Sequence, residues 1–555
     1  MQNPRRISLD LEEIAALLSF AGETKFKVRA YRRAAHVVNA LGDDLGSLVE
    51  QGRLQELDGI GPALARQIEE LWNLGSSELL TRLRREQPPG ATELIQVEGM
   101  TRQRVRKLHD ALGISSVQEL RAACEGKRVR TVAGFGAKTE ARLLASVERW
   151  LRREVAPPRP LTLAAALELA EAIQSRLSGS VKEAALAGAL RRGEETVHEI
   201  EFVISGDAGP ALDRVSSLRQ VLQLDREHGT AKLTDGVVLR LHAAAQNAFG
   251  SRLVLATGPP AHVEKLLDRS PDKPLPAFAT EAAVYASIGC AVVPPELRAG
   301  RDELDRARHE DFADLLDVSD IQGMVHCHTI HSDGKNTVLE MARATHALGM
   351  QYLTITDHSP SAHYANGVTL DRLKAQWDEI DAAREQVPIR ILKGTESDIL
   401  ADGSLDFPDE ILERFDVVIA SIHARHRMDR AAMTERLTRA LSLPIFKIWG
   451  HALGRILNHR PPIECDVPAV LDALAGSRGA IEINADPHRL DLPPEWIPEA
   501  RARKIPFVIS VDAHSTRGFG VLRYGSIMAR RGGITRSEVL NTLPADEFVR
   551  RVRPG

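Results

Sequence analysis

The 555-residue sequence predicts a multidomain α/β protein that ends in a barrel of seven parallel strands. Apolar residues recur at helical spacing through most of residues 1–152, so this region is expected to be helical. Strand-like segments at Ile200–Ile204 and Gly236–Leu241 follow a helical run and indicate an α+β middle region. From about Ile321 onward, short β-branched runs alternate with helical segments, which is the pattern of a β/α barrel.

Composition shifts and turn residues suggest five domains. The expected bounds are 1–80 and 81–155 for two helical domains, 156–245 for the α+β domain, 246–312 for a mixed region, and 313–555 for the barrel. Ala156-Pro-Pro-Arg-Pro160 is the clearest linker, because proline-rich stretches do not continue a helix.

The net charge of -4 conceals a basic stretch. Residues 101–150 carry 11 Lys/Arg and 5 Asp/Glu, a local excess of +6. A basic excess of this kind suits a polyanion, although a solvated charged helix face would have the same composition.

The cysteines and the apolar runs limit the class of protein. The four cysteines are scattered without a CxxC pair, which argues against a disulfide scaffold or a zinc ribbon and fits a reducing compartment. No signal peptide is visible, and no run reaches the ~18 apolar residues of a membrane span. We therefore expect a cytoplasmic protein that does not contact membranes.

Three glycine turns repeat within the helical region. They are Leu57-Asp-Gly-Ile-Gly-Pro62, Val97-Glu-Gly-Met-Thr-Arg102 and Val132-Ala-Gly-Phe-Gly-Ala137. Each resembles a helix-hairpin-helix motif, in which glycine lets the backbone approach a phosphate at a helix N-terminus. The residues expected to contact DNA are Gly59, Gly61, Gly99, Gly134, Gly136 and Lys138. Glycine-capped helical hairpins without a ligand are the alternative, and Thr101 replaces the second glycine of the middle copy.

The middle region resembles the nucleotidyltransferase palm of family X DNA polymerases. Leu186–Ile204 matches the motif G-S-x-R-R-G-x-E-T through Gly188, Arg191 and Arg192, and this motif is normally followed by an Asp-x-Asp pair. With the hairpins and the barrel, the whole chain is similar to bacterial members of this family (PolX).

The match fails at the positions that would bind the polymerase metals. Ala189 replaces the motif serine, Glu199 and Glu201 replace the aspartate pair, and Val238 replaces the third carboxylate. Two-metal phosphoryl transfer needs all of these carboxylates, so we expect a retained palm fold with a weak or lost polymerase. Slow synthesis supported by Glu199 and Glu201 is the alternative. Gln67 stands where some relatives carry a lyase lysine, so that activity is not expected there.

Six of the seven predicted barrel strands end in residues that bind metals. Active sites of barrel enzymes are built at the C-terminal ends of the strands, which predicts one polynuclear metal centre here. The arrangement resembles a PHP domain, a distorted seven-stranded barrel with three metal ions. That resemblance implies nine ligands: His326, His328, Asp333, His358, Glu396, His423, His451, Asp512 and His514.

The donor types indicate which ions and which chemistry to expect. Imidazoles with carboxylates suit Mn²⁺ or Zn²⁺, with Fe²⁺ as a further option. We expect Glu396, His358 and Asp512 to take part in catalysis, Glu396 as a bridging ligand. Arg425 and Arg455 are expected to steady the scissile phosphate, or else to form surface salt bridges. Asn484 on the sixth strand could line the site, and Cys327 should point into the core.

The sequence therefore predicts a monomeric DNA repair protein whose barrel hydrolyses phosphodiesters, chiefly as a 3′→5′ exonuclease, on gapped, nicked or 3′-ended DNA. The palm and hairpins would serve mainly to bind DNA. An active gap-filling polymerase with an editing barrel, a non-catalytic DNA-end scaffold and a small-molecule phosphatase are the alternatives.

Overall fold

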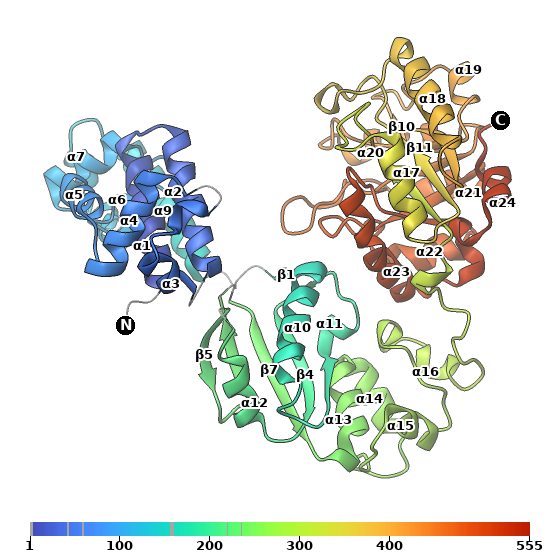
Figure 1. Ribbon diagram of the computed structural model, residues 1–555, viewed down its shortest axis with the longest axis horizontal. Helices are drawn as coiled ribbons and strands as arrows, with labels where there is room; N and C mark the ends of the chain where they lie inside the picture. Colours follow the sequence, from blue (N-terminus) through green and yellow to red (C-terminus); the bar gives the residue numbers. More distant parts are fainter. Residues whose placement is uncertain (1–3, 42–43, 58–59, 156–159, 219, 235) are drawn as a thin grey trace. The chain divides into compact units, whose positions relative to one another are not determined.

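The computed structural model describes residues 4–41, 44–57, 60–155, 160–218, 220–234 and 236–555 (Figure 1). The chain divides into two compact units, residues 1–157 and 158–555. This division falls inside the predicted linker Ala156–Pro160, of which only Pro160 lies among the described residues. The finer domain bounds at residues 80, 245 and 312 stay predictions.

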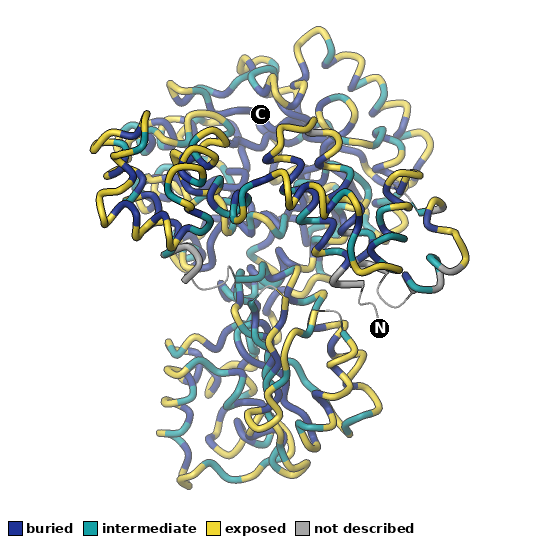
Figure 2. Tube along the Cα trace, turned by 90° about the vertical axis from the view of Figure 1, so that its left-hand side faces the viewer, coloured by how far each residue is buried: buried dark blue, intermediate teal, exposed yellow. Residues whose placement is uncertain are grey.

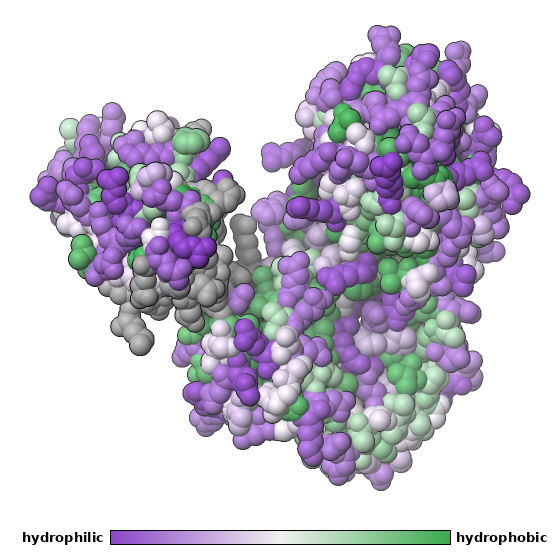
Figure 3. Space-filling view, viewed as in Figure 1, coloured by the Kyte–Doolittle hydropathy of each residue, from purple (hydrophilic) through white to green (hydrophobic). Residues whose placement is uncertain are grey.

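The first unit is helical throughout its described residues, as the apolar spacing predicts. Its α-helices are α1 (Pro4–Ala21), α2 (Lys25–Leu41), α3 (Asp44–Glu50), α4 (Pro62–Leu74), α5 (Glu78–Glu86), α6 (Ala91–Leu94), α7 (Arg102–Leu112), α8 (Val117–Glu125) and α9 (Ala137–Val155). Apolar side chains of α1 to α5 form one core, and those of α6 to α9 form a second core that also takes in Phe20. Hydrophilic residues dominate the face of this unit that Figure 3 shows, as expected when the apolar stripe of each helix is turned inward.

The second unit begins with a five-stranded sheet. Its strands are β2 (Ala184–Ala187), β4 (Glu199–Ser205), β5 (Val221–Asp225), β6 (Thr230–Leu233) and β7 (Val238–Ala244), in the order β2-β4-β7-β6-β5. β4 contains the predicted strand Ile200–Ile204, and β7 overlaps the predicted strand Gly236–Leu241 but begins two residues later. β4 and β7 run parallel, with Glu199 opposite Val238 and Glu201 opposite Arg240. Apolar residues of α10 (Leu163–Leu177) and α12 (Ala208–Val215) pack on this sheet.

Short helices follow the sheet, in a region where the sequence has little regular periodicity. They are α13 (Phe249–Thr257), α14 (Pro260–Arg269), α15 (Glu281–Ser287) and α16 (Glu303–Arg306). Their apolar residues form a separate small core. A buried His262 bonds to Glu303 at 2.7 Å and to Tyr285 at 3.0 Å inside it.

Seven parallel strands then form the barrel, in chain order from β8 to β14. They are β8 (Gly323–Cys327), β9 (Tyr352–Ile355), β10 (Arg390–Asp398), β11 (Val417–Ser421), β12 (Lys447–Trp449), β13 (Gly479–Asn484) and β14 (Phe507–Ser510). The barrel closes where β8 meets the residues that follow β14, through a few backbone hydrogen bonds. His328 N–H donates to Ala513 O at 2.9 Å, and Ala513 N–H donates to His326 O at 3.0 Å.

Helices cover the outside of the barrel. They are α17 (Val338–Ala347), α18 (Leu370–Arg384), α19 (Asp409–Leu412), α20 (Arg430–Leu441), α21 (Val467–Ala475), α22 (Ile497–Ala502), α23 (Leu522–Arg531) and α24 (Ala545–Val552). In Figure 2 the strands trace mostly as buried chain and the surrounding helices alternate between buried and exposed. Parallel strands buried on both faces have nearly continuous apolar sequences, which explains why the sequence predicts them clearly.

The inner face of the barrel changes from apolar to polar along each strand. Ile419, Ala480 and Val508 lie in an apolar floor on which Phe548 of α24 packs. Because side chains alternate along a strand, the next inner positions are polar: Ser421 after Ile419, Glu482 after Ala480, Ser510 after Val508. The barrel is thus solid at one end and lined with polar groups at the other.

Within the part of the chain that the structure describes, no helix has both the length and the apolar character needed to cross a membrane.

Candidate metal centre

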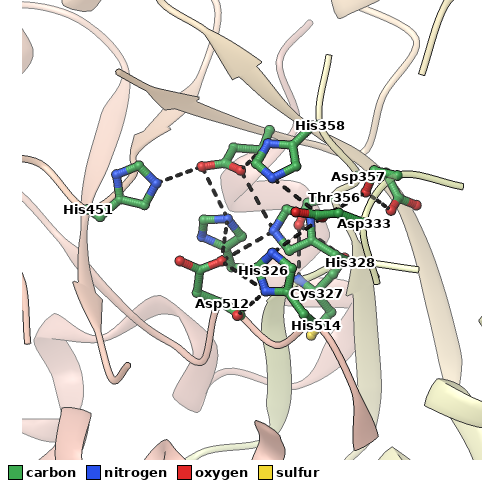
Figure 4. Close-up of polar contacts among 12 residues, drawn as sticks. His326, Cys327, His328, Asp333, Thr356, Asp357, His358, His451, Asp512 and His514 are labelled. Atoms are coloured by element: carbon green, nitrogen blue, oxygen red, sulfur yellow. Dashed lines mark hydrogen bonds and ion pairs between the residues drawn. The ribbon is translucent and has the colours of Figure 1, made fainter. Parts of the chain in front are cut away.

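The strand ends bring all nine predicted ligands together at the polar end of the barrel. Figure 4 labels His326, His328, Asp333, His358, His451, Asp512 and His514 among them. Eight of them fall into three overlapping groups whose donor atoms lie within 4.8 Å of one another, and the groups are His328/Asp333/His358/His514, His326/His328/Asp512 and His358/Glu396/His423. The ninth, His451, places Nε2 2.8 Å from Glu396 Oε1.

The backbone is distorted where several ligands leave the strands. His326, His451 and Asp512 have φ of +66°, +25° and +48°, in the left-handed region that non-glycine residues seldom adopt. The pairing of β8 with β9 also shifts register between Met324 and Cys327. Such outliers persist only where surrounding structure enforces them, and they cluster at functional sites. Cys327, between two ligands, is fully buried in the apolar core, as predicted.

Glu396 lies at the middle of the cluster. Its Oε1 is 2.8 Å from His451 Nε2, 3.2 Å from His423 Nε2 and 3.4 Å from His326 Nε2. Its Oε2 is 2.9 Å from His358 Nδ1 and 3.7 Å from His328 Nε2. Both oxygens therefore face imidazoles from opposite sides, which is the placement that a bridging carboxylate requires.

Several buried donor atoms at this site make no hydrogen bond among the described residues. They are His326 Nε2, both ring nitrogens of His328, His358 Nδ1, His451 Nδ1 and Glu396 Oε2. Buried polar atoms are nearly always hydrogen-bonded, so a cluster of exceptions needs another partner. A convergence of imidazole nitrogens and carboxylate oxygens is the donor set that binds divalent cations.

The charges at the site point the same way. Burial alone would raise the pKa of the Glu396 carboxyl, but the imidazoles of His423, His326 and His358 hold that pKa well below its usual range. Burial would likewise lower the pKa of His423, yet Glu396 and Asp398 raise it to about 10. In the protein alone, protonated histidines therefore supply the positive charge that these carboxylates attract.

Two carboxylates that orient ligands were not predicted from the sequence. Glu482 of β13 is fully buried, and its Oε1 lies 2.5 Å from His326 Nδ1. Asp398 at the end of β10 lies 2.5 Å from His423 Nδ1. A carboxylate behind a histidine fixes the orientation of the ring and raises its basicity toward a metal. The signal for Glu482 was its position two residues before Asn484 in an otherwise apolar strand.

Other polar groups surround the opening of the site. Asn484 Nδ2 donates to Asp512 Oδ2 at 3.2 Å, so this residue does line the site. Arg489, which the sequence did not single out, places Nε 3.7 Å from Asp512 Oδ2. The ring of the exposed Tyr364 lies 6.0 Å from His358 and 6.1 Å from His423, measured between ring centres.

Of the two arginines predicted to hold the phosphate, Arg455 has other partners. Arg455 is buried and donates from Nε to Arg489 O at 2.9 Å, from Nη2 to Leu490 O, and from Nη1 and Nη2 to Glu195 Oε1 at 3.2 Å. These bonds occupy its guanidinium, so the prediction that Arg455 steadies the phosphate is corrected. Arg425 is exposed on the loop after β11 and contacts no ligand among the described residues, so its role stays a prediction.

Each of the two glutamates of the palm has a hydrogen-bond partner within the protein. Arg240 donates to both oxygens of Glu199, at 3.1 and 3.0 Å. Glu201 Oε2 lies 2.8 Å from His242 Nε2, and Arg252 lies 2.9 Å from the other nitrogen of that ring. Glu199 is therefore paired with the Arg240 guanidinium and Glu201 with the His242 ring, at the positions where a polymerase would bind metal, and Val238 adds no ligand.

The arginines of the palm motif also have internal partners. Arg191 binds both oxygens of Glu281, at 2.9 and 2.6 Å, and Arg192 donates to Thr257 O at 2.7 Å. Gly188 has φ +66°, and a side chain there would collide with Glu201. These contacts preserve the turn of the motif. Both Nη atoms of Arg191 already donate to Glu281, so they are not free to bind the phosphates of a nucleotide.

The hairpin glycines are exposed where the structure describes them. Gly99 and Gly134 have φ of +89° and +91°, and Gly61 and Gly136 directly precede α4 and α9. Lys138 is exposed at the start of α9. Gly59 lies outside the described residues.

Comparison with protein families agrees with this geometry. The helix-hairpin-helix domain matches residues 1–77, the SAM-like helix-hairpin-helix tandem matches residues 91–149, and the PHP domain matches residues 325–485. The fold and the site thus define a protein that combines helix-hairpin-helix domains with a PHP barrel, as the sequence predicted.

Relatives identify the family. The chain is 32% identical to "DNA polymerase/3′-5′ exonuclease PolX" of Bacillus subtilis (strain 168), with 96% of both chains covered. It therefore belongs to the PolX family. The barrel also resembles a probable phosphatase of Thermoanaerobacter sp. (strain X514), at 29% identity over 39% of this chain and 89% of the relative. A probable phosphatase of Caldanaerobacter subterraneus is 33% identical over 29% of this chain and 60% of the relative.

Proposed function

We propose that this protein is a metal-dependent phosphodiesterase that shortens DNA from 3′ ends, with the barrel as its catalytic centre. The observation that carries this proposal is the convergence of nine ligand-type side chains, several of whose buried donor atoms make no hydrogen bond among the described residues. The B. subtilis relative carries the name of a polymerase and of an exonuclease, the Thermoanaerobacter relative is a probable phosphatase, and the PHP domain matches residues 325–485 of the barrel. The hydrolytic function therefore belongs with the barrel.

The three donor groups support three divalent ions, of Mn²⁺, Zn²⁺ or Fe²⁺. When bound, such ions lower the pKa of a water molecule and neutralise phosphate oxygens. Glu396 would join two of the ion positions, because its two oxygens face different imidazoles. Glu482 and Asp398 would keep the rings of His326 and His423 oriented. Asp512 and His358 would take part in catalysis as members of the donor groups.

The helical unit supplies DNA binding in this proposal. Its exposed glycine turns precede helices, where free backbone N–H groups and the helix dipole favour a phosphate. Contacts of this kind hold DNA without reading its sequence, which suits gapped, nicked or 3′-ended substrates. We propose that the chain acts as a monomer, since one chain contains the complete ligand set.

The palm would serve as a platform and not as a polymerase. The support is electrostatic: Arg240 and His242 occupy the carboxylates that would otherwise attract metal ions. Glu199, paired with the fixed charge of Arg240, and Glu201, bonded to His242, would bind an added divalent ion less well, and the third carboxylate is missing. An active gap-filling polymerase is the rival proposal.

One gel separates the rivals. A 5′-labelled primer on a one-nucleotide gapped duplex is incubated with Mn²⁺, with and without dNTPs, using wild type and the His326→Ala/His328→Ala double variant. We expect wild type to shorten the primer and the variant to leave it intact. Extension by wild type would restore the polymerase proposal. Intact primer with wild type, at a concentration that binds the duplex, would favour a non-catalytic scaffold.

A further inference from the structure

Arg489 stands at the metal centre with its hydrogen-bonding capacity unused. It lies in the loop after β13, with Nε 3.7 Å from Asp512 Oδ2 and 3.9 Å from Asp486 Oδ2. Both separations exceed a hydrogen bond, and among the described residues its side chain donates none. The side chain is 20% exposed, so its donors are accessible beside a predicted ligand.

The backbone of this arginine is held by another arginine. Arg455 donates from Nε to the carbonyl of Arg489 and from Nη2 to that of Leu490. The buried Asp491 accepts from the backbone N–H groups of Leu453 and Arg455, at 3.1 and 3.3 Å. The two loops are thus clamped to each other, and the position of Arg489 depends on the guanidinium of Arg455.

A palm residue fixes that guanidinium. Glu195 Oε1 accepts from both Nη atoms of Arg455, and Glu195 Oε2 lies 2.5 Å from Arg531 of α23. Side chains of Glu195 and Arg455 are only 17% and 9% exposed. Breaking a buried ion pair leaves a charge without a partner, so this link is sensitive to substitution. Glu195 belongs to the same palm motif as Arg191 and Arg192 and follows them in the sequence.

We propose that Arg489 binds the phosphodiester at the metal centre, and that Glu195 of the palm positions it through Arg455. This inference rests on the proposed nuclease function and extends it. A guanidinium can bind two phosphate oxygens at once, which suits a phosphodiester held next to metal ions. Glu195 and Arg455 are positioning residues, because they act on the substrate only through Arg489. The palm motif has thereby gained a role in the hydrolytic site.

The first part of the test replaces Arg489. In the full-length, Mn²⁺-loaded protein we expect Arg489→Ala to lower kcat on a 3′-ended oligonucleotide about 100-fold and Arg489→Lys to recover part of it. Deoxyadenosine 5′-monophosphate, which 3′→5′ hydrolysis would release, should bind Arg489→Ala about 10-fold more weakly. Metal content should not change. Unchanged nucleotide affinity with kcat within about 3-fold of wild type would overturn the role of Arg489.

The second part tests the link from the palm. Glu195→Gln should lower kcat about 10-fold, with Glu195→Asp less affected, and should add nothing to Arg489→Ala in the double variant. Glu194→Gln is the matched control, because Glu194 pairs with Arg531 at 3.2 Å and with Arg192 at 3.3 Å, and no ion pair among the described residues joins it to Arg455. Losses that add in the double variant, or an equal loss in Glu194→Gln, would overturn the link.

Two outcomes separate this inference from the proposed function. If wild type shortens no DNA but Arg489→Ala still weakens nucleotide binding, the nuclease proposal fails and the phosphate contact stands. If wild type is a nuclease and Arg489→Ala changes neither kcat nor nucleotide affinity, only the inference fails. Thermal unfolding of every variant, checked against Glu194→Gln, identifies any loss of activity that comes from loss of fold.

Discussion

The palm and the barrel both gather carboxylates and histidines, yet they neutralise them differently. In the palm, Glu199 and Glu201 each have a protein partner, Arg240 and His242. In the barrel, Glu396 is surrounded by five imidazoles, and several of the donor atoms lack any hydrogen bond among the described residues. The palm glutamates are thus held by hydrogen bonds within the protein, whereas the barrel keeps donor atoms that a metal ion could bind.

This contrast shows how a metal site can be lost without loss of its fold. Arg240 on β7 lies opposite Glu201 on β4, so a cation one strand away reaches the carboxylates that a metal would use. The palm sheet and its motif turn remain, and the residues acquire structural partners. The first prediction therefore compares matched substitutions at the two sites.

Replacing one glutamate by glutamine at each site should give the largest difference. Glu396→Gln keeps the shape but removes the charge that faces five imidazoles, so we expect at least about a 1,000-fold loss of 3′ shortening. Glu201→Gln should change that activity by less than about 2-fold. Single-turnover kinetics on the gapped duplex would measure both. Equal losses in the two variants would remove the distinction between the sites.

Metal removal should lower thermal stability through the barrel. A ligand at 100 times its Kd stabilises the folded state by about 2.7 kcal/mol, which corresponds to a Tm change of roughly 5–11 °C for a domain of about 150–250 residues. We expect a chelator to lower Tm by this amount and Mn²⁺ to restore it. The Glu396→Gln variant should show a smaller response, and the Glu201→Gln variant the full one. A chelator without effect on wild type would contradict the prediction.

Metal binding should release protons. Burial would lower the pKa of both His423 and His514 in the metal-free protein. Nearby carboxylates outweigh it: Glu396 and Asp398 raise the pKa of His423 to about 10. Asp333 and Asp512 raise that of His514 to about 9. Both rings are therefore protonated at pH 8 and must lose a proton to become ligands, so metal affinity should rise with pH up to about pH 9–10.

Calorimetric titration of Mn²⁺ into metal-free protein, in two buffers of different ionisation enthalpy, measures this release. We expect about one proton or more per chain at pH 8. Heats that do not depend on the buffer would show that the rings are already neutral.

The smallest effect is expected at the palm ion pair. Side chains of Arg240 and Glu199 are 36% and 40% exposed, so solvent screens their attraction and Arg240→Met should cost less than about 1 kcal/mol of unfolding free energy. No primer extension should appear, because Val238 still offers no carboxylate. Denaturant unfolding and the gap-filling gel test both statements. Extension by this variant would mean that Arg240 alone suppresses the polymerase.

The sequence predicted the barrel well because its signals are local. Each strand is a short apolar run with a polar residue at its end, so the strands and the nine ligand-type residues could be predicted from the sequence alone. The structure places these nine residues together, and their assignment as ligands stays a proposal. The glycine turns at Gly99 and at Gly134–Gly136 were predictable for the same reason, whereas Gly59 of the first turn lies outside the described residues. The short helices after the palm carry weaker periodicity, and their packing could not be predicted.

The partners of these residues could not be predicted, because they depend on distant parts of the chain. Arg455 follows a ligand closely in the sequence, but its carboxylate partner Glu195 lies 260 residues away. Glu482 is one polar residue in a buried strand, and only the closed barrel brings it to His326, 156 residues away. Arg489 belongs to a loop whose course no local pattern defines.

The closure of the barrel links metal loading to completion of the fold. The first and last strands, β8 and β14, are joined by only a few backbone hydrogen bonds. Predicted ligands lie in or just after both strands: His326 and His328 at β8, Asp512 and His514 after β14. An ion shared by these two strands would join chain segments that lie far apart in the sequence, and cross-links that close long loops remove the most entropy from the unfolded chain. The same ions that activate the site would thereby stabilise the closed barrel. A chain that has not yet folded its last strand could not assemble a working centre.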